Sequence, residues 1–317
     1  MITRYVNTAS TAGGNGTTND TVGANRAYAS LSAAVAYFES SPPSEDVTIL
    51  CCGTAADVGN LTINDCTASG YTITIAGNPN VSNGRFPGYY STNHYRWVSN
   101  STPSAIAVYI SSGRTVRLLG LQAIQNAFYD VIRASGSGLF VVDSCFIKGA
   151  KGIDQYANTN VLNTVFVNAV GSSHGIQKNW GVLYAYNCLF TGFNSGVWGW
   201  GSAVVKNCIA FNNGTDFSGG LTIDHCASDD NSGTNPITVS NWADQFYSVN
   251  YVADGDFRLK STSVLLSAGV GPGVDRDVPV NDILSFSRSG TSATVGPFEH
   301  EYGYGYYIPH PVPGRPI

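Results

Sequence analysis

The chain has 317 residues, of which only 12% are charged, and its formal net charge is −5. A nucleic-acid partner is not expected, because a groove for phosphates needs clustered Lys and Arg, and no run of 18 apolar residues offers a membrane span. The 36 glycines, together with many Ser, Thr and Asn, favour strands joined by tight turns over long helices.

The N-terminal region, residues 1–45, is predicted to contain one strand, a Gly/Thr-rich loop and one helix. Ser30 is a suitable helix N-cap, and the apolar residues that follow it recur on one helical face: Leu31, Ala34, Val35 and Phe38. The prolines after Ser41 stop the helix. A single amphipathic helix ahead of many strands suits a cap over the open end of a solenoid, where unpaired strand edges would otherwise promote aggregation.

The next region, residues 46–300, is predicted to form one continuous solenoid with an insertion at about 78–103. Short segments that alternate apolar and polar residues repeat about every 20 residues. Each has a cysteine or its substitute at the same point: Cys145, Val165, Cys188, Cys208 and Cys226. This period is typical of a parallel β-helix, in which identical positions stack and share one core.

The seven cysteines are an odd number, and five of them are expected at inward positions that stack: Cys66, Cys145, Cys188, Cys208 and Cys226. Free cysteine packs in a core much as a small apolar residue does, and no paired Cys-x-x-Cys motif indicates a metal site. The N-terminus lacks the basic-then-apolar layout of a secretory signal, so we expect reduced thiols and folding in a cytoplasm. No metal or other cofactor is expected.

Segments near both ends carry a family resemblance. Near the start they are Tyr5-Val6-Asn7, Gly13-Gly14-Asn15-Gly16-Thr17 and Ala27-Tyr28-Ala29-Ser30-Leu31; near the end they are Asp256-Phe257-Arg258-Leu259-Lys260, Asp275-Arg276-Asp277 and Val295-Gly296-Pro297-Phe298-Glu299. These resemble the opening and closing segments of the pectate-lyase-like superfamily. Tyr71-Thr72-Ile73-Thr74-Ile75 and Tyr95-Arg96-Trp97-Val98 are similar to β-helix proteins encoded by tailed bacteriophages. The resemblance implies an all-β fold, a right-handed single-stranded parallel β-helix solenoid with an N-terminal capping helix.

Superfamily members that cleave polysaccharides gather several Asp on adjacent rungs around calcium, which needs six to eight oxygens. Here Asp143 and Asp224 occupy equivalent positions but lie four rungs apart, roughly 19 Å at a strand spacing near 4.8 Å. That separation is too large for one ion or for a pair of glycosidase carboxyls. Two further pairs, Asp229-Asp230 and Asp275 with Asp277, lie in turn-like stretches where solvated carboxylates are normal. The sequence therefore indicates no catalytic residue.

Aromatic residues in one part of the repeat are the candidate binding residues: Trp180, Tyr184, Trp198 and Trp200. Trp198-Gly199-Trp200 places two indoles on the same face, and the glycines around them leave them uncovered. Such platforms stack on sugars or anchor protein interfaces. The alternative is that these rings fill a wide corner of the solenoid.

The last segment, residues 301–317, is predicted to be an extended arm, since its prolines cannot donate hydrogen bonds to a strand ladder. Its tyrosines offer contact area, and its prolines reduce the freedom that is lost on docking. We expect it to dock on another subunit through these residues: Tyr302, Tyr304, Tyr306, Tyr307, Pro309, Pro311 and Pro313. The alternative is that it packs back along its own solenoid.

These features favour a non-enzymatic virion structural protein of a tailed bacteriophage, a capsid-decorating or fibre-like module that folds in the host cytoplasm. Its partners would be other virion or capsid proteins. Assembly into a homotrimer and binding to a cell-surface glycan are further alternatives. One alternative is a polysaccharide-cleaving enzyme or tailspike-like depolymerase with a groove lined by Trp198 and Trp200. Another is an extracellular or cell-surface adhesin that binds carbohydrate.

Overall fold

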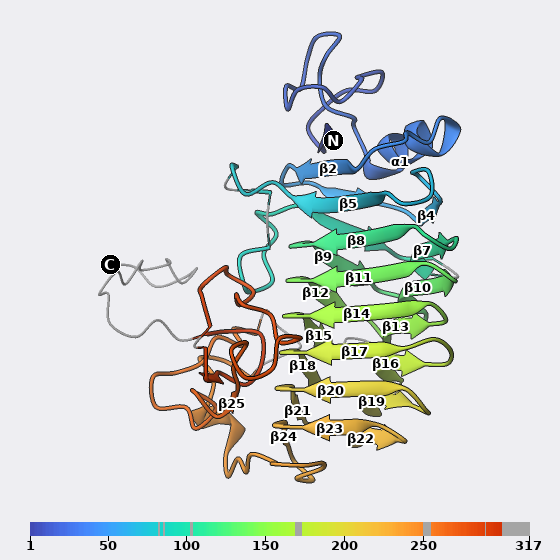
Figure 1. Ribbon diagram of the computed structural model, residues 1–317. Helices are drawn as coiled ribbons and strands as arrows, with labels where there is room; N and C mark the ends of the chain where they lie inside the picture. Colours follow the sequence, from blue (N-terminus) through green and yellow to red (C-terminus); the bar gives the residue numbers. More distant parts are fainter. Residues whose placement is uncertain are drawn as a thin grey trace, which may run out of the picture.

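The computed structural model describes residues 1–81, 83–84, 86–101, 104–168, 173–249, 255–288 and 290–299. Its main body is a parallel β-helix whose three long sheets, A, B and C, run along the coil (Figure 1). Each regular turn of the coil contributes one strand to sheet A, then one to sheet B and one to sheet C. The predicted fold class, a right-handed parallel β-helix with one N-terminal helix, is confirmed.

The nine strands of sheet A are β1 (Ile2–Asn7), β2 (Val47–Cys52), β5 (Thr72–Gly77), β8 (Thr115–Leu119), β11 (Leu139–Asp143), β14 (Asn158–Leu162), β17 (Leu183–Tyr186), β20 (Ala203–Lys206) and β23 (Thr222–Asp224). The eight strands of sheet B are β3 (Ala56–Val58), β6 (Arg96–Ser99), β9 (Gln122–Gln125), β12 (Phe146–Lys148), β15 (Val165–Val167), β18 (Leu189–Thr191), β21 (Ile209–Phe211) and β24 (Ala227–Ser228). The seven strands of sheet C are β4 (Leu61–Asn64), β7 (Ser104–Ile110), β10 (Asp130–Gly136), β13 (Lys151–Gln155), β16 (His174–Lys178), β19 (Ser195–Gly199) and β22 (Thr215–Gly219).

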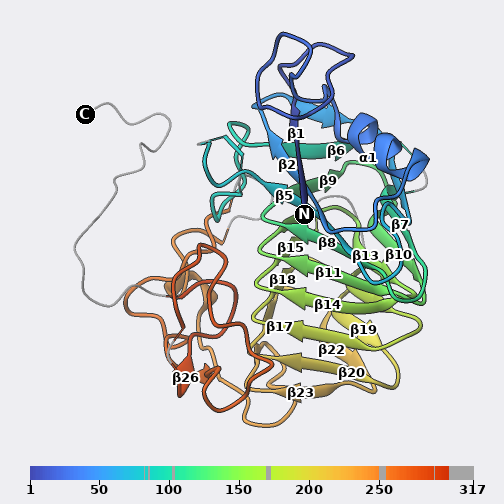
Figure 2. The same ribbon diagram turned by 45° about the horizontal axis from the view of Figure 1, so that its top comes forward.

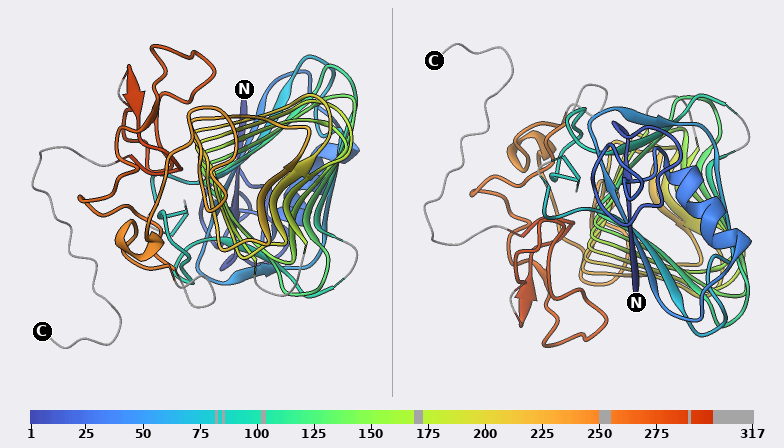
Figure 3. Two further views of the ribbon diagram at one scale, coloured as in Figure 1. Left: turned by 90° about the horizontal axis from the view of Figure 1, so that it is seen from below. Right: turned by 90° about the horizontal axis from the view of Figure 1, so that it is seen from above.

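Helix α1 (Leu31–Ser40) packs at the N-terminal end of the coil (Figure 3). Ser30 is its N-cap, as predicted, and the Ser30 hydroxyl accepts a hydrogen bond from the backbone N–H of Ala33 at 3.2 Å. The predicted apolar face, including Leu31 and Phe38, is buried in the main core. No helix among the described residues is long and apolar enough to cross a membrane.

The corner between sheets A and B explains the repeat in the sequence. One residue at this corner has a positive φ, between 48° and 65°, in six successive turns of the coil: Gly120, Ser144, Asn163, Asn187, Asn207 and His225. Glycine adopts this left-handed conformation freely, and Asn is among the side chains that tolerate it best. The recurring Asn-Cys dipeptide follows from this geometry, because Asn forms the corner and the next residue enters the core.

The residues after this corner form a column inside the coil. The backbone N–H groups of Cys188 and Cys208 each lie 3.4 Å from the sulfur of the cysteine one turn further on, Cys208 and Cys226. All seven cysteines are buried and free, as predicted. Burial raises the pKa of the Cys145 thiol to about 12, so this group is not ionised at neutral pH.

Two predicted members of the column lie elsewhere. The sequence pattern aligns Val165 with the cysteines, but Val165 pairs with Phe146 in sheet B, and Thr164 takes the cysteine position. Cys66 follows β4 of sheet C and so lies at a different corner. Both errors arise because the turns of the coil differ in length, so a fixed spacing does not assign the register.

The insertion predicted at about residues 78–103 is shorter than expected. A loop leaves the coil after β5, and the chain returns at residues 96–99 as β6, which pairs with β3 and β9. Trp97 in this strand is only 2% exposed, so it belongs to the core rather than to a surface loop. Within the loop, Phe86 and Tyr90 pack on Phe146 of sheet B, with ring centroids 5.6 and 5.8 Å away.

The β-helix also ends before residue 300, contrary to the predicted boundary. After β24 the chain adds one more bridge to sheet A, Thr234 with Asp224, and one to sheet B, Ile237 with Ala227. Residues 241–249, 255–288 and 290–299 then lie along the side of the coil (Figures 2 and 3). This segment contains the short helix η1 (Trp242–Asp244) and the antiparallel pair β25 (Gly269–Val270) and β26 (Ser292–Ala293). It covers the apolar outer face of sheet B, and together they form a second core: Phe146, Val165, Leu189, Ile209, Phe211, Phe246, Phe257, Leu265, Ile283 and Val295. In this segment, many apolar residues without the alternation of a strand therefore indicate a layer that covers sheet B, and not further turns of the coil.

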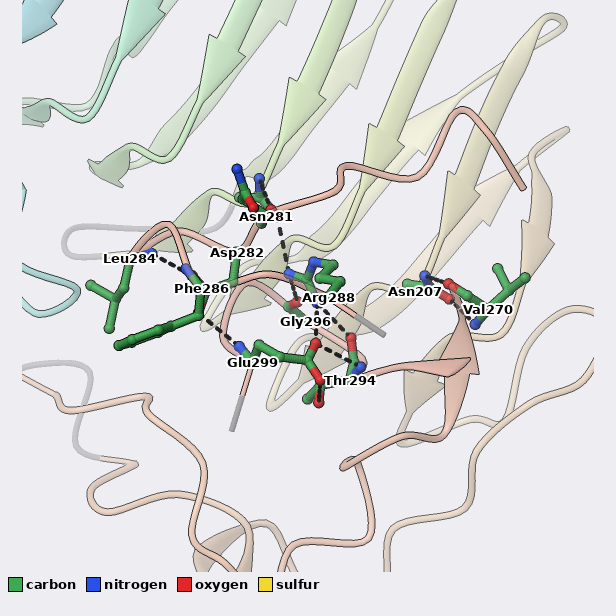
Figure 4. A network of polar contacts seen from close by, with 11 residues as sticks. Asn207, Val270, Asn281, Asp282, Leu284, Phe286, Arg288, Thr294, Gly296 and Glu299 are labelled. Carbon is green, nitrogen blue, oxygen red and sulfur yellow. Dashed lines mark hydrogen bonds and ion pairs between the residues drawn. The ribbon is translucent and has the colours of Figure 1, made fainter. Parts of the chain in front are cut away.

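Polar contacts join the A–B corner to this covering segment, and Figure 4 shows Asn207 of the corner and Arg288 of the cover. The Arg288 side chain is 0% exposed, and its guanidinium lies 3.1 Å from the Glu299 carboxylate. It also donates to Asn163 Oδ1 at 3.1 Å. Asn207 exchanges two hydrogen bonds with the backbone of Val270, at 2.8 and 3.0 Å. The corner asparagines thus form turns and hold the cover.

Candidate binding surface

The outer face of sheet C differs from that of sheet B. Within the described part of the chain, no residue of sheet C joins the second apolar core. Outward side chains that are paired in register form two rows along the coil, which we call lanes. The first lane contains Asp130, Lys151, His174, Ser195 and Thr215, and the second contains Arg133, Asp154, Gln177, Trp198 and Ser218. Neighbours in a lane are about 4.8 Å apart along the coil. A ligand that runs along the coil would meet them in turn.

Three tryptophans lie where sheet C turns into sheet A, and we call Trp180, Trp198 and Trp200 the tryptophan corner. Trp198 is in β19 and Trp200 follows this strand, while Trp180 follows β16 one turn earlier. The rings of Trp198 and Trp200 are 6.4 Å apart and perpendicular. Trp180 is 71% exposed and Trp200 is 66% exposed, so large apolar rings remain in water.

His174 extends this aromatic surface. Its ring stacks on that of Trp198, with centroids 5.5 Å apart and 21° between the planes. Burial lowers the pKa of His174, and the charge of Lys151 acts in the same direction. The imidazole is therefore neutral at pH 7, and it supports the indole as a flat, uncharged neighbour.

Tyr184, the fourth aromatic residue named from the sequence, is not part of the corner. It lies in β17 of sheet A, where it is 38% exposed and its ring is 6.1 Å from that of Tyr186. Sheets A and C face different sides of the coil (Figure 3). The sequence could not separate Tyr184 from the tryptophans, because nothing in it marks where the chain passes from sheet C to sheet A.

Hydroxyl groups lie beside the tryptophan corner. The hydroxyls of Ser195 and Thr215 are 2.8 Å apart, and the Ser218 hydroxyl donates to that of Ser195 at 3.2 Å. Ser218 is also the register neighbour of Trp198. An indole flanked by hydroxyls suits a sugar, because the apolar face of the ring can stack while the sugar hydroxyls exchange hydrogen bonds.

A second group on this face is charged, and we call Asp130, Lys151 and Asp154 the lysine–aspartate cluster. The Lys151 ammonium lies 3.1 Å from Asp130 Oδ1 and 3.5 Å from Asp154 Oδ1. Asn179 donates to the same Asp154 oxygen at 2.9 Å. Burial raises the pKa of Asp130, and Lys151 opposes this rise. This cluster was not predicted from the sequence, although the step of 21 residues from Asp130 to Lys151 is one turn of the coil.

The carboxylates that the sequence analysis considered do not join this cluster. Asp143 and Asp224 lie in β11 and β23 of sheet A, with three strands between them, which confirms the predicted separation. Asp143 pairs with Arg117 at 2.5 Å, and Asp275 pairs with Lys206. Among the described residues, no group of three or more His, Cys, Asp or Glu is arranged to hold a metal ion.

One more carboxylate, Asp216, lies at the lower end of sheet C but is turned away from the solvent. It is 2% exposed and accepts hydrogen bonds from Asn213 Nδ2 at 2.8 Å and from the backbone N–H of Asp229 at 2.6 Å. Burial raises its pKa to about 7. These contacts fasten the turn after β24 to β22, so we assign Asp216 a structural role.

The predicted docking arm, residues 301–317, lies outside the described residues. Its tyrosines and prolines are therefore not placed on any surface, and its docking role stays a prediction.

Comparison with known proteins does not assign the chain to a family. No protein-family model matches the chain, and no curated protein is significantly similar to it. Among solved structures, the crystal structure of pectate lyase Pel9A is similar, with 15% sequence identity and a TM-score of 0.46 over 95% of this chain and 97% of that chain. The three parallel sheets described above establish the β-helix directly.

Proposed function

We propose that the protein is a non-enzymatic β-helix that binds an extended carbohydrate chain on the outer face of sheet C. The observation that supports this most strongly is the exposure of Trp180 and Trp200 beside Trp198. Burying an indole contributes a large free energy, so a rigid surface that leaves several in water is suited to a partner that covers them.

The chemistry around the tryptophan corner favours carbohydrate over protein. Perpendicular indoles offer a sugar one ring to stack on and a second to contact its edge. The hydroxyl of Ser218 and the amide of Gln177 are partly exposed and lie in the same lane as Trp198. Strands about 4.8 Å apart match the advance per ring of an extended glycan, so successive sugars can contact successive turns. A protein partner would need a broader apolar centre around its anchor residues.

The biological setting we propose is the virion of a tailed bacteriophage, with a host cell-surface glycan as ligand. Its support is the resemblance that residues 71–75 and 95–98 bear to segments of such proteins and the low content of charged residues. An extracellular or cell-surface adhesin would use the same face. Co-sedimentation with purified capsids separates the two settings, since an adhesin would stay in the supernatant.

Cleavage of the bound glycan is the second candidate function, and the lysine–aspartate cluster is the observation in its favour. Asp130 and Asp154 contact the same ammonium and so lie near each other, and glycosidases hold two carboxyls about 5 to 9.5 Å apart. A raised pKa would suit Asp130 to the role of general acid. Against this role, Asp154 is only 5% exposed, and Lys151 and Asn179 already occupy its Oδ1. We therefore prefer binding without cleavage.

Affinity electrophoresis tests the proposed function. The protein is run through native gels that contain a neutral polysaccharide (dextran or xyloglucan) or an acidic one (alginate or polygalacturonate), beside an unrelated protein of similar size. We expect specific retardation in at least one gel and no release of reducing ends from that polysaccharide. Migration equal to that of the control in every gel would count against carbohydrate binding. Release of reducing ends that is lost in Asp154→Asn would establish the second candidate instead.

A further inference from the structure

Each exposed tryptophan turn is held from inside the coil by a buried polar side chain. Gln155, the last residue of β13, donates from Nε2 to the carbonyl of Trp180 at 2.8 Å. Lys178, the last residue of β16, donates from Nζ to the carbonyl of Trp200 at 2.7 Å. The register places Lys178 directly beside Gln155. The same contact is therefore made twice, and each time it reaches the turn one coil further on.

Polar residues occur at this inward position of sheet C in these two strands alone, within the described part of the chain. The five other strands have apolar residues or glycine there: Ile63, Val108, Ala134, Gly199 and Gly219. The strands that carry Gln155 and Lys178 are also the two whose next turn carries an exposed tryptophan. The buried polar residue and the exposed indole therefore occur together.

Placing these groups inside the coil is unfavourable. Gln155 is 0% exposed and Lys178 is 5% exposed, and taking an amide or an ammonium out of water costs free energy that its hydrogen bonds must offset. Burial accordingly lowers the pKa of Lys178. An apolar residue, as in the neighbouring strands, would fill this position without that cost. The contact to the tryptophan turn supplies a reason for keeping a polar residue.

We propose that Gln155 and Lys178 are positioning residues, which fix the turns of Trp180 and Trp200 so that the exposed indoles are ordered before a ligand arrives. Each tryptophan is followed by a glycine with positive φ, Gly181 at 66° and Gly201 at 74°, and such turns are free to move unless they are held. A surface that is already ordered loses less conformational freedom on binding. The identity of the ligand rests on the proposed function, whereas the ordering of the indoles does not.

Fluorine NMR of the full chain labelled with 5-fluorotryptophan tests the ordering without any ligand. The protein has five tryptophans, so its signals can be assigned by single substitutions. In Lys178→Met we expect the Trp200 signal to shift or broaden while the signal of the buried Trp97 stays unchanged. Gln155→Leu should affect Trp180 in the same way. Lys178→Gln, which copies the preceding turn, should leave the Trp200 signal as in the native protein.

Two results of this experiment would overturn the proposal. One is a Trp200 signal that does not change in Lys178→Met. The other is an equal change at Trp97, which would show that Lys178 supports folding in general rather than one turn.

The affinity of the same variants completes the test, using the polysaccharide that retards the native protein most. The Lys178→Met variant keeps the side chains that contact the ligand, but its Trp200 indole must become ordered on binding. We therefore expect it to bind the polysaccharide about tenfold more weakly. Lys178→Gln should bind as the native protein does. If no polysaccharide binds, the proposed function fails, while the fluorine spectra still decide whether the indoles are positioned. If the Trp200 signal changes and the affinity does not, the inference is wrong.

Discussion

The outer faces of sheets B and C belong to the same coil, but they carry opposite kinds of surface. On sheet B, Leu189 and Ile209 are at most 1% exposed, because the described residues of the covering segment pack on them. On sheet C, no residue of the described chain belongs to the second apolar core, and Trp200 just beyond β19 is 66% exposed. The inward faces of both sheets are mostly apolar and contribute to one core. The difference teaches that the coil is specified by its inward residues, while its outward residues decide between a permanent cover and an open binding face.

The largest effect is expected from breaking the buried ion pair on the covered side. Arg288→Ala leaves the Glu299 carboxylate without its cation, which should lower the free energy of unfolding by about 3 to 5 kcal/mol, as measured by urea denaturation. Arg117→Ala is the matched control, because its pair with Asp143 is partly exposed, and it should cost at most about 1 kcal/mol. Equal losses would show that the cover is not anchored as we describe.

A smaller but still large loss of stability is expected when an outward residue of sheet B is truncated, compared with an outward residue of sheet C. Leu189→Ala on sheet B removes a fully buried side chain and should cost about 2 to 5 kcal/mol of unfolding free energy. Gln177→Ala on sheet C removes a partly exposed one and should change stability by about 0.5 kcal/mol or less. If the substitution on sheet C were as costly, that face would be a covered interface and not a free surface.

The coil and part of its exposed face could be predicted from the sequence, whereas the cover and the contacts between turns could not, for physical reasons. The coil was predictable because the left-handed corner favours Asn or Gly, which occupy four of its six positions, and this preference recurs about once per turn. The covering segment was not predictable, since its described residues contact the coil through apolar side chains that show no period. Trp198 and Trp200 could be nominated because they are two residues apart. The lysine–aspartate cluster and the contact from Lys178 to Trp200 join residues of different turns, and they become visible once the register is known.

The core that both faces share offers a third prediction, with a moderate effect. Cys188→Ser should cost about 1 kcal/mol, because the serine hydroxyl can donate to the Tyr186 carbonyl as the thiol does at 3.3 Å, and Thr164 already provides a hydroxyl in this column. Thiol titration of the native protein should find seven groups in denaturant without reductant and almost none in the folded state. Fewer than seven in denaturant would show that disulfides had formed.

A dependence of stability on pH is expected from Asp216. Its pKa is about 7 in the folded protein and near 3.8 in the unfolded chain, so the folded state holds the proton more tightly. The stability that Asp216 contributes is therefore fully present below about pH 4 and is lost as the pH rises through about 7. A carbon-13 NMR titration of the Asp carboxyls should show one midpoint near 7 that is missing in Asp216→Ala. A midpoint near 4 would show that this side chain is solvated.

The most direct measurement of the proposed role of sheet C compares the polysaccharide affinity of two variants. The double variant Trp198→Ala/Trp200→Ala removes both perpendicular indoles, whereas Tyr184→Ala removes an exposed ring from sheet A. With the polysaccharide that retards the native protein, we expect the double variant to lose about 2 kcal/mol or more of binding free energy, roughly a thirtyfold weaker affinity. Tyr184→Ala should bind like the native protein. Unchanged binding in the double variant, or an equal loss in Tyr184→Ala, would contradict a binding face centred on the tryptophan corner.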